Sequence, residues 1–96
     1  MNGEFEVSQS NLAEEKLREL LEVFRLRGKA APAARAVRWI IEELSRTPMQ
    51  FGESRDYLEE LNLHVRVGFA RPWRVNYAVH LPSQSVFIQM GGATES

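Results

Sequence analysis

The sequence predicts an α+β domain of order β-α-α-β-β-β, with a helical hairpin packed on one face of a small, mainly antiparallel sheet. Apolar residues recur at three- and four-residue spacings over residues 10–46, as they do in amphipathic helices. Over residues 61–90 apolar and polar residues alternate instead, as they do in strands. Two amphipathic helices cannot bury both apolar faces alone, so the strands are expected to cover them.

The first strand is expected at residues 4–8, where Phe5 and Val7 alternate with charged or polar residues. A helix follows, with Ser10 or Asn11 as its N-terminal cap and Gly28 as its natural end. The apolar positions of this helix fall on one face and comprise Leu12, Leu17, Leu20, Leu21 and Phe24.

A second helix is predicted from about Pro32, where a missing N–H does no harm in the first turn, to about Arg46, before Pro48. Its apolar face comprises Ala33, Val37, Ile40, Ile41 and Leu44. Residues 47–56 are expected to form a loop, with a helical turn at 57–60 as one continuation.

Three strands are predicted in the C-terminal half. A three-residue loop at 70–72 joins the first two, which pairs Arg66 with Asn76 and Gly68 with Arg74. A four-residue loop at 82–85 leads into the last strand, whose edge is expected to be exposed. In this register the large side chains that face the helices include Phe69, Trp73 and Tyr77. A single domain is therefore expected over residues 1–92, in which Gly91 begins a polar end and residues 93–96 are a short tail.

The other face of the sheet is expected to be open and polar. The predicted register gathers on it Asn62, His64, Arg66, Arg74, Asn76, His80, Phe87 and Gln89. Arginine forks fit phosphate oxygens, histidines can exchange protons near neutral pH, and an aromatic ring can stack on a base. Each also has a plain alternative, since such residues on strands often serve only solubility or pack under a partner.

Composition narrows the classes of function. The 96 residues carry a net charge of −1 and no cysteine, which excludes disulfides and thiolate chemistry; no metal and no cofactor are expected. No run of 18 apolar residues occurs and residues 1–10 lack a signal sequence, so a cytoplasmic protein without membrane contact is expected. Acids exceed bases by four in residues 1–22 and bases exceed acids by four in residues 25–46. These blocks either complement one another across the hairpin or offer a basic surface to a partner.

From Arg46 to Met90 the sequence resembles the RelE/ParE superfamily of type II toxin–antitoxin toxins, which are plasmid-stabilisation proteins. The residues that carry the resemblance are RTPMQFG at 46–52, YLEEL at 57–61, Val65-Arg66-Val67, PWRVNYAV at 72–79 and Val86-Phe87-Ile88. They cover about half of the chain directly, and the order of elements extends the similarity to nearly all of it.

The resemblance implies a growth-inhibiting toxin that a cognate antitoxin protein neutralises, and that either cuts mRNA in the ribosome or inhibits DNA gyrase. In the RelE branch the arginine that matches Arg74 contacts and stabilises the scissile phosphate. The resemblance supplies no acid or base, and His64 or His80 would substitute for them, since a histidine can exchange protons near neutral pH. The accompanying binding residues are expected to be Arg66, Arg71, Asn76, Phe87 and Gln89. An antitoxin segment is expected to place acidic residues on Arg66, Arg71 or Arg74 and apolar residues in an adjoining groove.

Two departures favour the ParE branch, which inhibits its target without cutting RNA. RelE-type nucleases carry a tyrosine, often with a basic residue, after the last strand, whereas GGATES follows Met90 here. The chain also has only two lysines, Lys16 and Lys29, although RNA binding usually needs a strong positive field. ParE-like inhibition is therefore expected first, with the mRNA endoribonuclease and a non-toxic binding module as alternatives.

Overall fold

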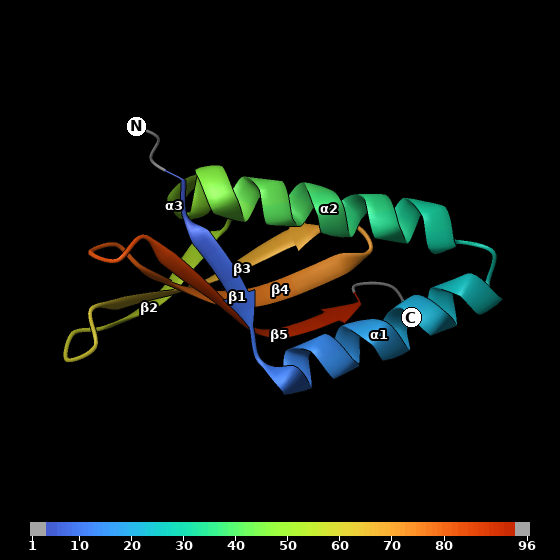
Figure 1. Ribbon diagram of the computed structural model, residues 1–96, viewed down its shortest axis with the longest axis horizontal. Helices are drawn as coiled ribbons and strands as arrows, with labels where there is room; N and C mark the ends of the chain where they lie inside the picture. Colours follow the sequence, from blue (N-terminus) through green and yellow to red (C-terminus); the bar gives the residue numbers. More distant parts are fainter. Residues whose placement is uncertain (1–3, 94–96) are drawn as a thin grey trace.

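The computed structural model describes residues 4–93, which form a five-stranded sheet with two long helices packed on one of its faces (Figure 1). The elements in chain order are β1 (Glu6–Gln9), α1 (Asn11–Leu26), α2 (Ala30–Arg46), α3 (Pro48–Phe51), β2 (Glu53–Leu58), β3 (Leu63–Ala70), β4 (Trp73–His80) and β5 (Ser85–Ala93). The predicted α+β class and hairpin are confirmed, and α3 and β2 are additional elements between α2 and β3.

The strands lie in the order β1-β5-β4-β3-β2, with β1 parallel to β5 and the other pairs antiparallel. Strand β1 pairs with Ser85–Ile88 of β5, so the expectation of an exposed edge on the last strand was wrong as far as Ile88. The predicted loop at 47–56 was also wrong, since it contains α3 and most of β2. Strand β2 lies at the edge of the sheet and is exposed over most of its length. It therefore needs no apolar face, and its sequence lacks the alternation that indicates a strand.

Local chemistry sets the ends of the helices as expected. The Ser10 hydroxyl accepts a hydrogen bond from the Ala13 N–H at 3.1 Å and so caps α1. After α1, Gly28 adopts a left-handed conformation with φ of 74°, which glycine accepts without strain. Ion pairs Arg25–Glu22 and Arg46–Glu43 lie within single helices and not across the hairpin. Within residues 4–93, no helix combines the length and the apolar character needed to span a lipid bilayer.

The core lies between the helices and the face of β4 and β5 that they cover. Its buried members are Ala13, Phe24, Ala33, Ile40, Leu44, Trp73, Val75, Tyr77, Val79, Val86 and Ile88. The predicted parity of β4 is therefore correct, because its alternate residues from Trp73 to Val79 all belong to this core.

The predicted parity of β3 was wrong. A two-residue turn at Arg71–Pro72 pairs Ala70 with Trp73, where a three-residue loop was expected. This one-residue change turns every β3 side chain to the other face. Arg66 now pairs with Tyr77 and faces the helices, whereas Phe69 pairs with Arg74 and points away from them.

Strand β5 also differs from the expectation. Phe87 pairs with Ala78 and Ile88 with Tyr77, after which Met90 pairs with Asn76, so Gln89 is the extra residue of a bulge. The strand then continues through Gly91 to Ala93, which pairs with Trp73. The polar end expected from Gly91 is thus part of the sheet, and residues 94–96 of the expected tail lie outside the described residues.

Replacing Trp73 with phenylalanine is expected to lower the free energy of unfolding by about 2–3 kcal/mol, from one lost hydrogen bond and a cavity. The Trp73 indole N–H donates to the Ala33 carbonyl at 3.0 Å, and its ring packs edge-on against Phe24 with centroids 5.3 Å apart. Urea denaturation followed by circular dichroism measures the change. Trp39→Phe is the matched control, since Trp39 is 47% exposed and should cost much less. Equal losses in the two variants would contradict this assignment.

Candidate functional site

The polar cluster predicted on the sheet is divided between its two faces. Arg74, Asn76, His80 and Phe87 lie on the open face, which is the face of the sheet away from α1 and α2. His64 and Arg66 face the opposite way, because they pair with Val79 and Tyr77 of the core. Their assignment to the open face was wrong for the reason already given, the one-residue shift of β3.

Arg66 is 9% exposed and holds the segment that enters β2. Its guanidinium donates to the Gly52 carbonyl through Nη2, and Nε donates to the Tyr77 hydroxyl at 3.4 Å. The same hydroxyl donates to the Pro48 carbonyl at 2.7 Å and accepts from the Gly52 N–H at 3.0 Å. These contacts tie α3 to β3 and β4, and leave Arg66 poorly placed to meet a ligand.

The three candidate catalytic residues do not meet in one place. Arg74 and His80 stand six positions apart on β4, which is about 20 Å along a strand. His64 lies on the other face of the sheet. A phosphate held by Arg74 would have neither histidine within proton-transfer reach, which is about 3 Å or one bridging water.

Both histidines have local partners. His80 Nδ1 lies 2.6 Å from the Ser83 hydroxyl, which donates to the Ser85 hydroxyl at 2.9 Å, so this group closes the turn between β4 and β5. The His64 ring stacks on Tyr57 with centroids 4.6 Å apart. Asn62, also expected on the open face, occupies the turn before β3 with φ of 56° and accepts from the Tyr57 hydroxyl at 2.7 Å.

The remaining binding candidates lie apart from one another. Arg71 is exposed in the turn between β3 and β4. Gln89 is exposed at the bulge of β5, beside the end of β1. Phe87 is 42% exposed on the open face. They are spread along the sheet, so they do not form one phosphate or base site.

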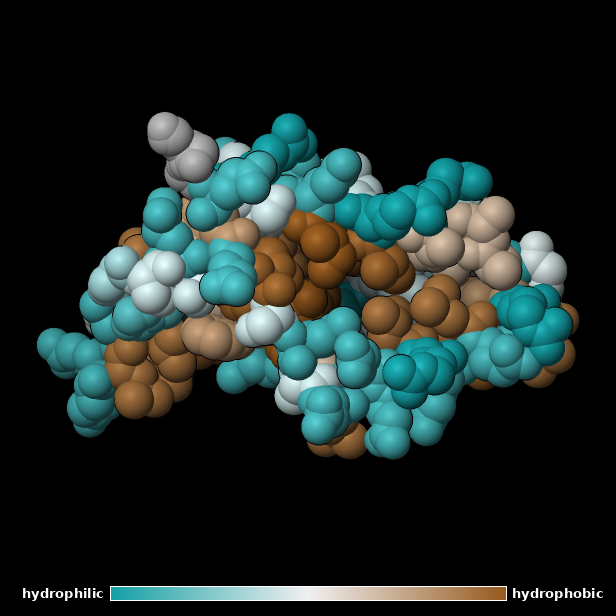
Figure 2. Space-filling model, viewed as in Figure 1, coloured by the Kyte–Doolittle hydropathy of each residue, from teal (hydrophilic) through white to brown (hydrophobic). Residues whose placement is uncertain are grey.

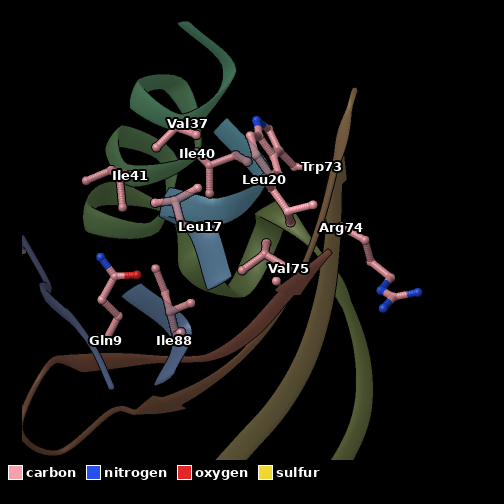
Figure 3. A pocket seen from close by; sticks show the side chains of 12 residues that line it. Gln9, Leu17, Leu20, Val37, Ile40, Ile41, Trp73, Arg74, Val75 and Ile88 are labelled. Atoms are coloured by element: carbon pink, nitrogen blue, oxygen red, sulfur yellow. The ribbon is translucent and has the colours of Figure 1, made fainter. Parts of the chain in front are cut away.

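An apolar groove lies between α1 and α2, above β4 and β5, and encloses about 130 Å³. Figure 2 shows hydrophobic side chains gathered in the gap between the two helices. The lining side chains come from all these elements and include Leu17, Leu20, Val37, Ile40, Ile41, Trp73, Val75 and Ile88 (Figure 3). Gln9 supplies a polar group at one end.

The groove exists because the apolar faces of the helices are wider than the sheet can cover. Leu17, Leu20 and Val37 are only partly buried, and Ile41 is 37% exposed. Sequence reasoning assigned these residues to the core. The wide apolar faces of both helices, visible in the sequence, could have indicated the groove. Such a hairpin requires a covering layer along its whole length, and an apolar groove remains where that layer is missing.

Arg74 does not reach into this groove. Its backbone contributes to the lining, but its side chain points away from the cavity, past the opposite face of the sheet (Figure 3). Gly92 lies across from Arg74 on β5, and a Cβ there would lie 3.1 Å from the Arg74 guanidinium. The Arg74 side chain therefore does not adjoin this groove, and the expectation that an antitoxin segment places acidic residues on Arg66, Arg71 or Arg74 stays a prediction.

The open face is more apolar than the sequence analysis predicted. Val65, Val67 and Phe69 form an apolar stripe along β3, and Ala78 and Phe87 lie beside it. Val67 and Ala78 are at most 2% exposed although neither belongs to the core under the helices. Phe69 is 53% exposed. The correct turn length would have revealed this stripe from the sequence.

Comparison with known protein families, with curated proteins and with solved structures gave no match to this chain.

Proposed function

We propose that the protein is the toxin of a type II toxin–antitoxin module, which acts in the bacterial cytoplasm by binding a target protein such as DNA gyrase. A cognate antitoxin protein neutralises it. In this proposal the inhibition is ParE-like and involves no cleavage of RNA. The observation that carries the proposal is the apolar groove between α1 and α2, which is suited to the apolar side chains of a protein segment.

The chemistry of the groove supports a protein ligand over a small charged one. Its walls are aliphatic apart from Trp73, and Gln9 is its polar group at the rim. A phosphate or nucleotide would leave its charges without partners there, at a large desolvation cost. An amphipathic antitoxin segment would instead bury apolar side chains against Leu20, Val37 and Ile41. We assign the antitoxin to this groove.

The separation of Arg74, His64 and His80 supports inhibition by binding over ribonuclease activity. Acid–base cleavage of RNA needs proton donors and acceptors within hydrogen-bond reach of the same phosphate group. His80 instead closes the turn between β4 and β5, and His64 stacks on Tyr57 on the opposite face of the sheet. Arg74 can still contact a ligand on the open face, but without a neighbouring acid or base.

Expression in a bacterial host without the antitoxin tests the proposal, with growth, plasmid supercoiling and transcript integrity followed in parallel. Growth arrest with relaxed DNA and intact transcripts is the expected result. Transcript cleavage at ribosome-bound codons, abolished by Arg74→Ala, would establish the endoribonuclease instead. Normal growth at high soluble expression would contradict both toxin mechanisms and support the non-toxic binding module.

The groove is tested by co-expression with the protein encoded beside the toxin. Ile41→Glu places a carboxylate inside the groove, and we expect its affinity for the antitoxin to fall at least about tenfold because the charge is buried without a partner. The variant should remain toxic and should no longer be rescued. Arg35→Glu is the matched control, since it also adds an acid on an exposed position of α2 but lies outside the groove lining. Rescue of both variants by the antitoxin would show that the antitoxin binds elsewhere.

A further inference from the structure

We propose that two pairs of charged residues beside the groove between α1 and α2 select its occupant, an amphipathic helix with two acidic and two basic side chains along its apolar face. The inference rests on the proposed function, since it takes the groove as the site of the antitoxin. It adds the conformation of the bound segment and the order of its charges, neither of which the apolar lining specifies.

The groove favours a helical segment over an extended one. Its walls are side chains of α1 and α2, and its floor is a face of the sheet and not an edge (Figure 3). A helix pairs its own backbone N–H and carbonyl groups, whereas an extended segment would lay them unpaired on apolar side chains. Packing the apolar stripe of a third helix between two others is also an ordinary arrangement of helices.

The first charged pair, Arg18 and Arg38, lies at one level of the hairpin. Each arginine is ten positions from Gly28, where the two antiparallel helices are joined (Figure 1). Three positions further along the chain, Leu21 and Ile41 are their neighbours on the helix surfaces. Ile41 lines the groove and Leu21 packs against the core. Because both arginines are exposed, one stands beside the groove on each helix.

The second charged pair, Glu14 and Glu42, lies one turn further from Gly28. Each glutamate is four residues from the arginine of its own helix, which is about 6 Å along the helix axis. Both glutamates are exposed. The groove is thus flanked by a basic level and then by an acidic level, the second nearer to β1. Figure 2 shows hydrophilic side chains on both sides of the apolar gap.

These four charges are not used within the chain. A spacing of four residues would allow Glu14 to pair with Arg18, and Arg38 with Glu42. Within residues 4–93, however, none of the four forms an ion pair or a side-chain hydrogen bond, whereas two other pairs on the same helices do. The unpaired charges therefore lie beside the groove, where a bound segment can meet them.

The complement of this pattern is a helix with acids on both flanks of its apolar stripe and bases on both flanks one turn away. The acids would meet Arg18 and Arg38, and the bases would meet Glu14 and Glu42. The order of the two levels fixes the direction in which the helix lies. Flanking charges of this kind set partner choice and orientation in coiled coils. Since exposed ion pairs each contribute little, they provide selectivity more than affinity.

Two synthetic peptides of identical composition test this selection. Each has about 15 residues, the length at which isolated helices become stable, with a leucine stripe, two glutamates and two lysines. The matched peptide has glutamate on both flanks of one turn and lysine on both flanks of the next. The alternating peptide has one of each at both turns. Fluorescence anisotropy with the full chain at low salt should show about tenfold tighter binding of the matched peptide.

Reversing the basic level should remove this preference. Arg18→Glu/Arg38→Glu is expected to bind the matched peptide about tenfold more weakly. Binding of the alternating peptide should stay within about twofold, because it meets one like and one opposite charge in either protein. Arg35→Glu/Arg55→Glu is the matched control, since it changes the net charge equally at exposed positions outside the groove lining. Circular dichroism confirms that both variants are folded.

The outcomes separate the charges from the groove. Equal binding of both peptides by the wild type, lost in Ile41→Glu, would overturn selection by charge and leave the groove as a docking site. A preference for the matched peptide that survives in Arg18→Glu/Arg38→Glu would also overturn it. Binding of neither peptide would overturn the helical occupant. None of these results bears on toxicity, which growth arrest tests separately.

Discussion

Replacing Tyr77 with phenylalanine is expected to lower the free energy of unfolding by about 3 kcal/mol, although only one oxygen atom is removed. Tyr77 is fully buried, and its hydroxyl serves the Pro48 carbonyl, the Gly52 N–H and the Arg66 guanidinium at once. Without that oxygen, two backbone groups and part of a buried charge lose a partner. Leaving such groups unsatisfied costs more than a hydrogen bond contributes on average.

Chemical denaturation of the two tyrosine variants measures this effect. Tyr57→Phe is the matched control, because the Tyr57 hydroxyl donates at 2.7 Å to Asn62 in an exposed position where water can replace it. We expect the control to lose less than about 1 kcal/mol. Losses of the same size in both variants would show that the network around Tyr77 contributes nothing beyond an ordinary exposed bond.

The ionisation of the Tyr77 hydroxyl is expected to make the stability of the protein depend on pH. Burial raises the pKa of Tyr77 above its ordinary value, and the hydrogen bond from Arg66 opposes this rise in part. Above about pH 10 the unfolded chain therefore releases a proton that the folded chain retains. The stabilisation is complete below that pH and declines as the pH rises through the pKa of the folded state. Wild type should lose stability more steeply than Tyr77→Phe in this range, and parallel curves would contradict the assignment.

Replacing Gly52 with alanine is expected to cost about 3 kcal/mol, at the upper end for overpacking. Gly52 lies between α3 and β2, and a Cβ there would overlap the Val67 carbonyl oxygen and lie 2.8 Å from the Tyr77 hydroxyl. The Val67 atoms belong to the backbone of a central strand and cannot rotate away. The added methyl group would thus push β2 from β3 and disturb the hydrogen bonds of Tyr77 and Arg66.

Gly91→Ala is the matched control for this substitution. Its added Cβ would meet the Arg74 carbonyl at 3.7 Å, an ordinary contact, so a change within about 1 kcal/mol is expected. Thermal unfolding compares the two variants, and amide exchange of residues 53–58 reports whether β2 loosens first. A Gly52→Ala protein as stable as the control, with β2 protected, would show that the close approach to Val67 imposes no constraint.

Tyr77→Phe and Gly52→Ala both disturb the contacts at the start of β2, which is the segment that the sequence analysis did not predict. The strand β2 was missed because Glu53–Leu58 is polar on both faces, and an edge strand can be polar since it buries little. Without β2, nothing indicated that Arg66 would serve as its internal anchor. An arginine between two valines on an alternating strand was instead interpreted as an exposed phosphate ligand.

The side chains of β3 were assigned to the wrong faces of the sheet, although the strand itself was predicted correctly. The alternation in β3 is real, but alternation alone does not say which set of residues faces the helices. Apolar Val65, Val67 and Phe69 were assigned to the core, yet the core face of β3 carries His64, Arg66 and Gly68. The Phe51 ring packs directly over Gly68, which fills the space that a side chain would otherwise take. The turn between β3 and β4 has two residues where three were predicted, and this difference exchanges the two faces of β3.

The local structure could be predicted from the amino-acid sequence: the two helices with their cap and glycine stop, the alternating strands of the C-terminal half and the α+β class. These follow from interactions between residues close in the chain, where periodicity and capping are directly visible. Three features became visible only in the folded protein: the face that each β3 side chain occupies, the burial of Arg66 and the separation of the candidate catalytic residues. The apolar groove that remains between α1 and α2 became visible there as well. These features depend on register and on packing between distant segments, which a one-residue shift reverses without changing any local pattern.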